Sequence, residues 1–177
     1  MRIAFWDNLL ILTSLVVALA QAPLALSAPH AVHDSSEGSK SRLEIRTQEG
    51  KRYVLRVLRD STVPSKSQPS QVQVVGELKG SAIIVVDSYR SKPGGMSYCQ
   101  AGYERFLRVI SVSSKAPKET FRVKIDSCRE NIELASRGIE WSPESSTLRI
   151  RWLLGPSTKG TPEERTVQIG RDGKPSY

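Results

Sequence analysis

The two cysteines of this chain are the residues whose chemistry the sequence predicts most directly. Cys99 and Cys128 are separated by about 30 residues, and an even pair of cysteines in an exported protein normally forms a disulfide. Closing a loop of about 30 residues stabilises a fold by roughly 3–4 kcal/mol. Two free, buried thiols are the alternative. A structural zinc site needs further ligands, and the only histidines, His30 and His33, precede the expected ordered region. We therefore expect no metal and no cofactor.

Residue sets that could catalyse a reaction are sparse. A Ser-His-Asp or Cys-His site needs an ordered histidine, which neither histidine of this chain is expected to supply. Paired carboxylates hydrolyse glycosides without histidine, and the chain offers Glu130 with Glu133 and the adjacent Glu163 and Glu164. Acidic residues in polar turns are usually solvated. We therefore expect no enzyme, and a small hydrolase with a cryptic carboxylate site is an alternative.

Four basic residues define a candidate cationic face. Arg122 and Lys124 alternate with apolar neighbours, and Arg149 and Arg151 do the same further along the chain. If the two segments are strands of one sheet, the four side chains form a patch that binds an anionic glycan or lipid surface in a salt-dependent way. An ordinary solvated face is the alternative. We expect no specific nucleic-acid binding, which would also need exposed aromatic residues between the charges.

Residues 88–103 are predicted to form a long loop that contains three of the five tyrosines. Tyrosine and arginine are enriched at binding hot spots, and a disulfide at Cys99 would preorganise the loop. Tyrosines that only cap a β-sheet core are the alternative. The candidate binding residues of this loop are Tyr89, Arg90, Tyr98, Gln100 and Tyr103.

The N-terminus predicts how the chain is sorted. Arg2 precedes an apolar run over residues 9–19, and Ala25-Leu26-Ser27 has small residues at signal-peptidase spacing. These features predict a cleavable signal peptide over residues 1–27. An uncleaved anchor is the alternative, but the apolar run is shorter than the roughly 20 residues that span a bilayer. We expect a periplasmic or secreted protein that does not span the membrane after cleavage.

Composition and charge fit one small domain. Removing residues 1–27 would leave 150 of the 177 residues and the full net charge of +8. Residues 28–41 are polar and predict a disordered linker, so the predicted domain covers residues 42–177. A positive excess favours anionic partners without specifying one.

The elements that would position these residues are short strands. Apolar residues alternate with polar ones on either side of a turn at residues 48–51, which predicts a hairpin over 42–57. Further strands are predicted over 72–78, 106–112, 119–126, 148–152 and 167–169. The apolar run 81–86 predicts a central strand covered on both faces, and residues 132–134 predict a short strand. Trp141 and Trp152 are expected in the core. The pattern predicts an all-β antiparallel sandwich or barrel of about eight strands.

These observations favour an exported, non-enzymatic binding module for a protein of the cell envelope. An inhibitor or immunity-type protein is one concrete form of it. A binder of anionic glycan or lipid surfaces through the basic strand face is the first alternative.

Overall fold

The structure is a computed structural model that describes residues 40–58, 60–93, 98–158 and 160–176. All of them belong to one compact unit, Ser35–Tyr177. The predicted signal peptide and most of the predicted linker lie outside the described residues. Among those residues, no helix is long and apolar enough to cross a membrane.

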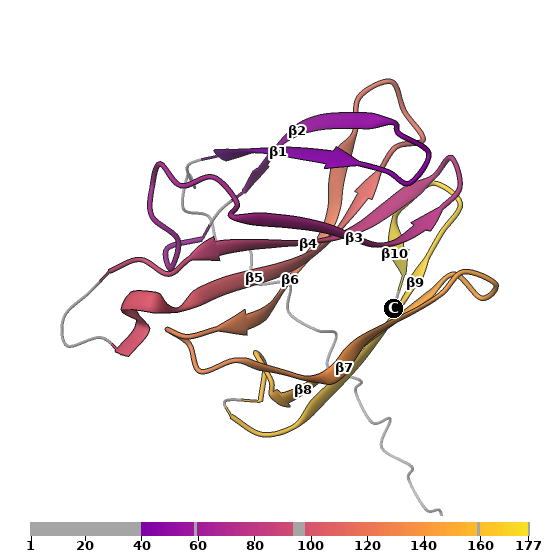
Figure 1. Cartoon of the computed structure of the whole chain (residues 1–177). Coiled ribbons are helices and arrows are strands. Elements are labelled where there is room, and N and C mark those ends of the chain that lie inside the picture. The colour runs from indigo at the N-terminus through magenta and orange to yellow at the C-terminus, as the bar shows by residue number, and fades with distance from the viewer. Residues whose placement is uncertain (1–39, 59, 94–97, 159, 177) are drawn as a thin grey trace, which may run out of the picture. The chain divides into compact units, whose positions relative to one another are not determined.

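The described chain forms strands and a single 3₁₀ helix, which confirms the all-β prediction (Figure 1). In chain order they are β1 (Lys40–Arg46), β2 (Arg52–Leu58), β3 (Gln71–Leu78), β4 (Ala82–Arg90), η1 (Tyr98–Ala101), β5 (Tyr103–Ser111), β6 (Lys118–Ser127), β7 (Glu133–Ser142), β8 (Thr147–Leu154), β9 (Glu163–Ile169) and β10 (Pro175–Ser176).

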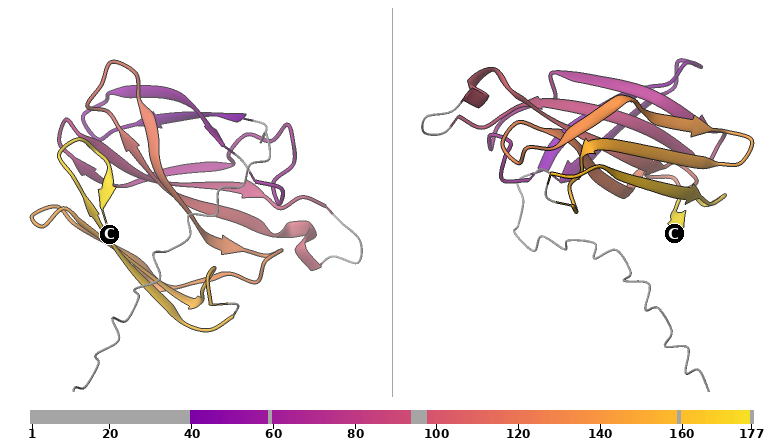
Figure 2. Two further views of the ribbon diagram at one scale, coloured as in Figure 1. Left: turned by 180° about the vertical axis from the view of Figure 1, so that it is seen from behind. Right: turned by 90° about the horizontal axis from the view of Figure 1, so that it is seen from below.

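The strands pair into three antiparallel sheets. The hairpin sheet is β1-β2, the central sheet is β3-β4-β5-β6, and the outer sheet is β10-β9-β8-β7. Figures 1 and 2 show the hairpin sheet and the outer sheet on opposite sides of the central strands. The domain therefore has three layers, and its ten strands exceed the predicted eight.

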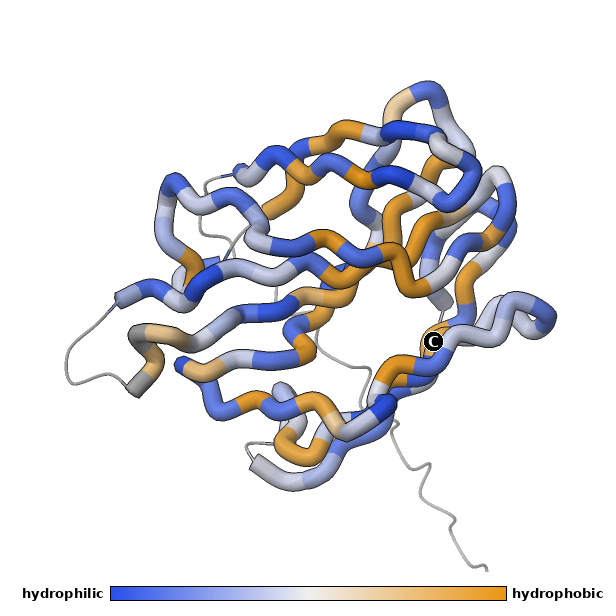
Figure 3. The backbone as a smooth tube through the Cα atoms, in the orientation of Figure 1, coloured by the Kyte–Doolittle hydropathy of each residue, from blue (hydrophilic) through white to orange (hydrophobic). Residues whose placement is uncertain are grey.

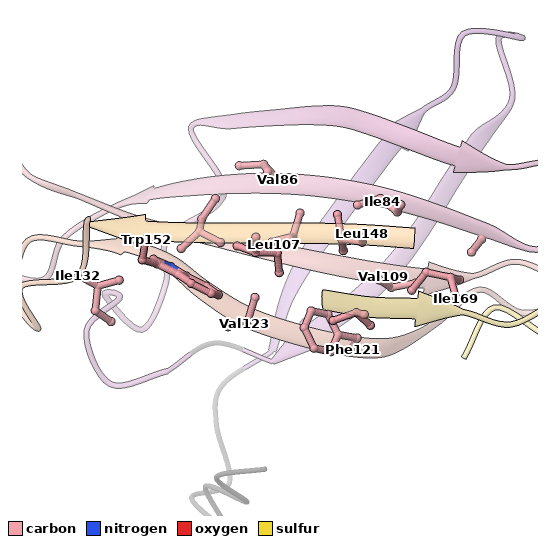
Figure 4. Close-up of a cluster of buried hydrophobic side chains, with 14 residues drawn as sticks. Ile84, Val86, Leu107, Val109, Phe121, Val123, Ile132, Leu148, Trp152 and Ile169 are labelled. Carbon is pink, nitrogen blue, oxygen red and sulfur yellow. The ribbon is translucent and has the colours of Figure 1, made fainter. Parts of the chain in front are cut away.

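Two apolar cores join the three layers. The larger core fills the space between the central and outer sheets, with Phe121 and Leu107 facing Leu148 and Trp152 (Figure 4). The smaller core joins the hairpin sheet to the opposite face of the central sheet. Trp152 is 2% exposed and Trp141 packs against the larger core, which confirms the expectation for both tryptophans.

Strand β4 belongs to both cores, because its side chains alternate between the two faces of the central sheet. Ile84 lies in the larger core and Ile83 and Val85 lie in the smaller one. Every residue of β4 except Arg90 is buried. The prediction of a central strand covered on both faces is confirmed.

Three predicted boundaries are wrong. The ordered region begins at Lys40, so the last two residues of the predicted linker belong to β1. The long loop shrinks to residues 91–102, because β4 extends to Arg90 and β5 begins at Tyr103. The short strand predicted at 132–134 is the beginning of β7, which continues to Ser142. Its bulge, in which Arg137 takes a positive φ of 54°, breaks the period-two pattern.

Candidate functional site

The disulfide closes one end of the central sheet. Cys99 in η1 is bonded to Cys128, one residue after β6, as the sequence predicted. Strands β5 and β6 are antiparallel neighbours, so the bridge ties the segment before β5 to the segment after β6. Gly102 lies against this bridge, and a Cβ there would be 2.7 Å from the Cβ of Cys128. Only glycine fits at this point without a shift of the disulfide.

A row of four polar residues crosses the central sheet beside the disulfide. Gln71 pairs with Ser88, Ser88 with Arg105, and Arg105 with Asp126. The side chains of Arg105 and Asp126 form an ion pair and are 39% and 32% exposed. On β4, β5 and β6, the next residues on the same face are apolar and belong to the larger core, whereas the next residue on β3 is polar. On these three strands the face therefore changes from core to polar surface within one register step.

This polar row forms the floor of an open groove with a volume of about 510 Å³. Tyr103, which is 47% exposed, stands at the groove beside Cys128. The groove therefore offers an aromatic face, a guanidinium–carboxylate pair, hydroxyls and an amide within one surface. Its lining residues are Ser70, Gln71, Ser88, Tyr103, Arg105, Asp126 and Cys128.

The structure separates the five candidate binding residues of the predicted loop. Tyr103 lines the groove, and Arg90 pairs with it in register and is exposed. Tyr89 is fully buried on the opposite face, so its assignment to a binding surface is wrong. Tyr98 and Gln100 lie in η1, and their side chains are outside what the structure describes.

Glu104 supports the groove from the other face of the central sheet. Its buried carboxylate accepts hydrogen bonds from Ser91 Oγ at 2.7 Å and from Ser127 Oγ at 2.6 Å. These bonds join β5 to the residue that follows β4 and to the last residue of β6. The disulfide joins η1 to the residue after β6 at the same end of the sheet, so this end is held at two points.

A second buried charge lies deeper on that face. Arg108 Nε donates to both carboxylate oxygens of Asp87, at 2.8 and 2.9 Å, and Nη1 donates to Glu119 at 2.9 Å. The Tyr89 hydroxyl also donates to Asp87, at 2.6 Å. Burial of Tyr89, followed by the charge of Asp87, raises the pKa of its hydroxyl. Burial alone would lower the pKa of Arg108, but the charges of Asp87 and Glu119 raise it.

Two residues of the candidate basic face contact the end of β2 and the segment that follows it. The Arg122 guanidinium donates to the Leu58 carbonyl at 3.0 Å. Lys124 Nζ lies 2.7 Å from Asp60 and 2.7 Å from Glu130, and its side chain is only 9% exposed. These cations therefore act as structural ties between the central sheet and the chain that follows the hairpin.

The other two residues of that face lie on a different sheet. Arg149 and Arg151 are in β8 of the outer sheet, whereas Arg122 and Lys124 are in β6 of the central sheet. Arg151 pairs with Glu140, and Arg149 lies 3.6 Å from Glu164 and 3.8 Å from Glu140. The prediction of one shared cationic patch is wrong, because β6 and β8 do not share a sheet.

Three of the four candidate carboxylates are engaged in ion pairs. Glu130 pairs with Lys124, and Glu163 lies 2.9 Å from Arg165 and accepts a hydrogen bond from the Ser157 amide. Of the residues that line the groove, Asp126 alone carries a carboxylate. Within the described residues, the groove therefore does not supply the two facing acids that glycoside hydrolysis uses.

The sequence did not indicate the polar row. Asp126 looked like the outward residue of an alternating strand, but the β-bulge opposite Arg105 and Phe106 turns it toward the groove. The available signal was the replacement of apolar residues by Ser88 and Arg105 at the period-two positions beyond Val86 and Leu107.

The chain matches no protein-family model and has no significant similarity to a curated protein or to a solved structure. Its function has to be inferred from the groove and its surroundings.

Proposed function

We propose that this chain is an exported, non-enzymatic binding module of the periplasm or the cell exterior, and that it holds a protein partner in the polar groove. The observation that carries the proposal is the exposed Tyr103 beside the Arg105–Asp126 pair on a face tied by a disulfide. Tyrosine and arginine recur at binding hot spots. A surface that is already ordered loses less conformational entropy when a partner binds.

An inhibitor or immunity-type protein that binds an enzyme of the cell envelope is the concrete form we favour. Such a protein needs a rigid surface of mixed polarity on a small, stable scaffold. The groove fits a protein better than a polyanion, because the charge of Arg105 is already balanced by Asp126.

A photo-crosslinking amino acid placed at position 103 in the exporting cell tests this proposal. We expect it to form a discrete adduct with one envelope protein, and we expect Arg105→Ala to reduce the adduct yield about tenfold, as for loss of a hot spot of about 1–2 kcal/mol. The adduct is measured by immunoblot and identified by mass spectrometry.

Position 153 supplies the matched control, because Leu153 on the outer sheet is 49% exposed and Tyr103 is 47% exposed. The same crosslinker at position 153 should not form this adduct. Identical adducts from both positions, or an adduct at position 103 that Arg105→Ala leaves unchanged, would overturn the proposal.

A further inference from the structure

The outward face of the hairpin sheet concentrates positive charge. Strands β1 and β2 alternate between buried apolar residues and outward residues, and Figure 3 shows this as alternating hydrophobic and hydrophilic segments. The eight outward side chains include five basic residues, one acidic residue and two apolar residues, a net charge of +4, whereas the whole chain has a net charge of +8. They are Lys40, Arg42, Glu44, Arg46, Arg52, Val54, Arg56 and Leu58.

The strand register places like charges opposite one another on this face. Arg42 faces Arg56, and Arg46 faces Arg52. Glu44 pairs with Arg52 at 2.8 Å and with Arg46 at 3.3 Å. Arg42 and Arg56 form no ion pair with any residue of the described chain. Like charges directly opposed across two strands destabilise the pairing, so the hairpin retains an unfavourable arrangement that an anionic ligand would relieve.

The same face exposes apolar side chains between the arginines. Val54 is 40% exposed and Leu58 is 43% exposed. A flexible polyanion is bound mainly through charge, whereas a surface that combines cations with apolar side chains suits the interface of an anionic bilayer. The apolar residues therefore favour a lipid surface over a glycan chain or a nucleic acid.

We infer that the outward face of the β1–β2 hairpin docks the protein onto an anionic phospholipid surface, with Arg42 and Arg56 contacting lipid phosphates. The groove opens on the face of the central sheet that carries the larger core, and the hairpin covers the other face. Docking through the hairpin leaves the groove free, so this inference does not rest on the proposed function.

Sedimentation with lipid vesicles tests the inference on the protein as the exporting cell processes it. We expect binding to vesicles of phosphatidylglycerol in phosphatidylcholine, with affinity that decreases steeply as salt increases. The double variant Arg42→Gln, Arg56→Gln should bind these vesicles about 30-fold more weakly, since each basic residue near an anionic surface contributes about a fivefold factor. Because the variant removes an opposed like-charge pair, its thermal unfolding midpoint should not decrease.

The double variant Arg149→Gln, Arg151→Gln is the matched control, because it removes the same charge from the outer sheet. Its vesicle affinity should stay within about threefold of the wild type, since both arginines are already paired with acidic residues. Equal losses in the two double variants would overturn the inference in favour of a general charge effect. Tight binding to heparin or DNA without binding to anionic vesicles would also overturn it.

Val54→Ser separates a lipid surface from a polyanion. It should weaken vesicle binding about threefold, as expected for removing part of an apolar side chain from the interface. It should leave binding to heparin unchanged. An unchanged vesicle affinity would show that Val54 does not enter the interface and would contradict docking on lipid.

Discussion

Among single residues, Arg108 makes the clearest contribution that can be measured. Its side chain is fully buried and ion-paired with Asp87 and Glu119. Removing one partner of a buried ion pair leaves an uncompensated charge, which costs about 3–5 kcal/mol. We therefore expect Arg108→Met to lower the free energy of unfolding by that amount, measured by urea denaturation.

The partner substitution provides the control for this prediction. Asp87→Asn combined with Arg108→Met removes both charges of the closest pair, so the double variant should lose less stability than Arg108→Met alone. If the double variant is at least as unstable as the single variant, the carboxylate of Asp87 is not the group that Arg108 compensates.

For single residues, the sequence predicted the structural role where the chemistry allows only one role. It failed where the role depends on residues from other parts of the chain. Cys99 and Cys128 are the only cysteines, so a bridge had a single connectivity. Lys124 alternates with apolar residues like a solvated lysine, yet it pairs with Asp60 from a distant segment and with Glu130 from the turn after β6. Tyr89 was assigned to the loop, because its burial depends on a contact that the sequence does not show. Its ring packs edge-on against the ring of Phe106, with 5.9 Å between the ring centroids.

Among the elements, the segment that follows β2 depends on one acidic residue. Burial alone would raise the pKa of Asp60, but hydrogen bonds from Lys124 and Thr62 and the charge of Lys124 hold the pKa below its usual value of 3.8. A lowered pKa in the folded state stabilises the fold above about pH 4, and this stabilisation is lost as the pH falls further. We expect Asp60→Asn to lower the unfolding free energy at neutral pH by about 1–2 kcal/mol.

The pH profile distinguishes this role from a general loss of packing. Between about pH 5 and pH 2, the unfolding free energy of Asp60→Asn should decrease less steeply than that of the wild type. Asp172→Asn is the control, because Asp172 also has a lowered pKa but is exposed beside Lys174. It should change stability little. If the unfolding free energies of the wild type and of Asp60→Asn change with pH in parallel, the charge of Asp60 does not stabilise the fold through Lys124.

The strands themselves were predictable in proportion to the regularity of their pattern. The hairpin over 42–57 and the doubly buried strand near 81–86 follow from alternation and from an apolar run, and both are confirmed. Most of strand β7 was not predicted. Ala135, Ser136 and Gly138 lie in a bulge between Leu134 and Ile139, which has more residues than the facing segment of β8, and this bulge interrupts the alternation. The polar row depends on another bulge, between Arg105 and Phe106. Bulges shift the facing of side chains without leaving a periodic signal.

For the whole molecule, the central sheet couples the other two layers, because it contributes to both cores. The disulfide joins the segments before β5 and after β6 at one end of that sheet, and it closes a loop with a sequence separation of 29. In the chain-entropy model, reducing it should lower the free energy of unfolding by about 3–4 kcal/mol. A domain of this size is expected to unfold as one unit. The loss of stability should therefore be the same in all three layers, although the disulfide lies at the central sheet alone.

Two probes in different layers measure this coupling. Tryptophan fluorescence reports the larger core, because Trp152 lies in it and Trp141 packs against it. Hydrogen exchange of the Leu43 and Leu55 amides reports the hairpin. After replacement of both Cys99 and Cys128 by alanine, we expect the two probes to lose the same unfolding free energy. A hairpin whose exchange is unchanged while the tryptophan signal is destabilised would mean that the hairpin sheet unfolds separately from the rest. In that case the basic face of the hairpin and the groove would belong to independently stable units, and a partner bound in the groove would stabilise only the central and outer sheets.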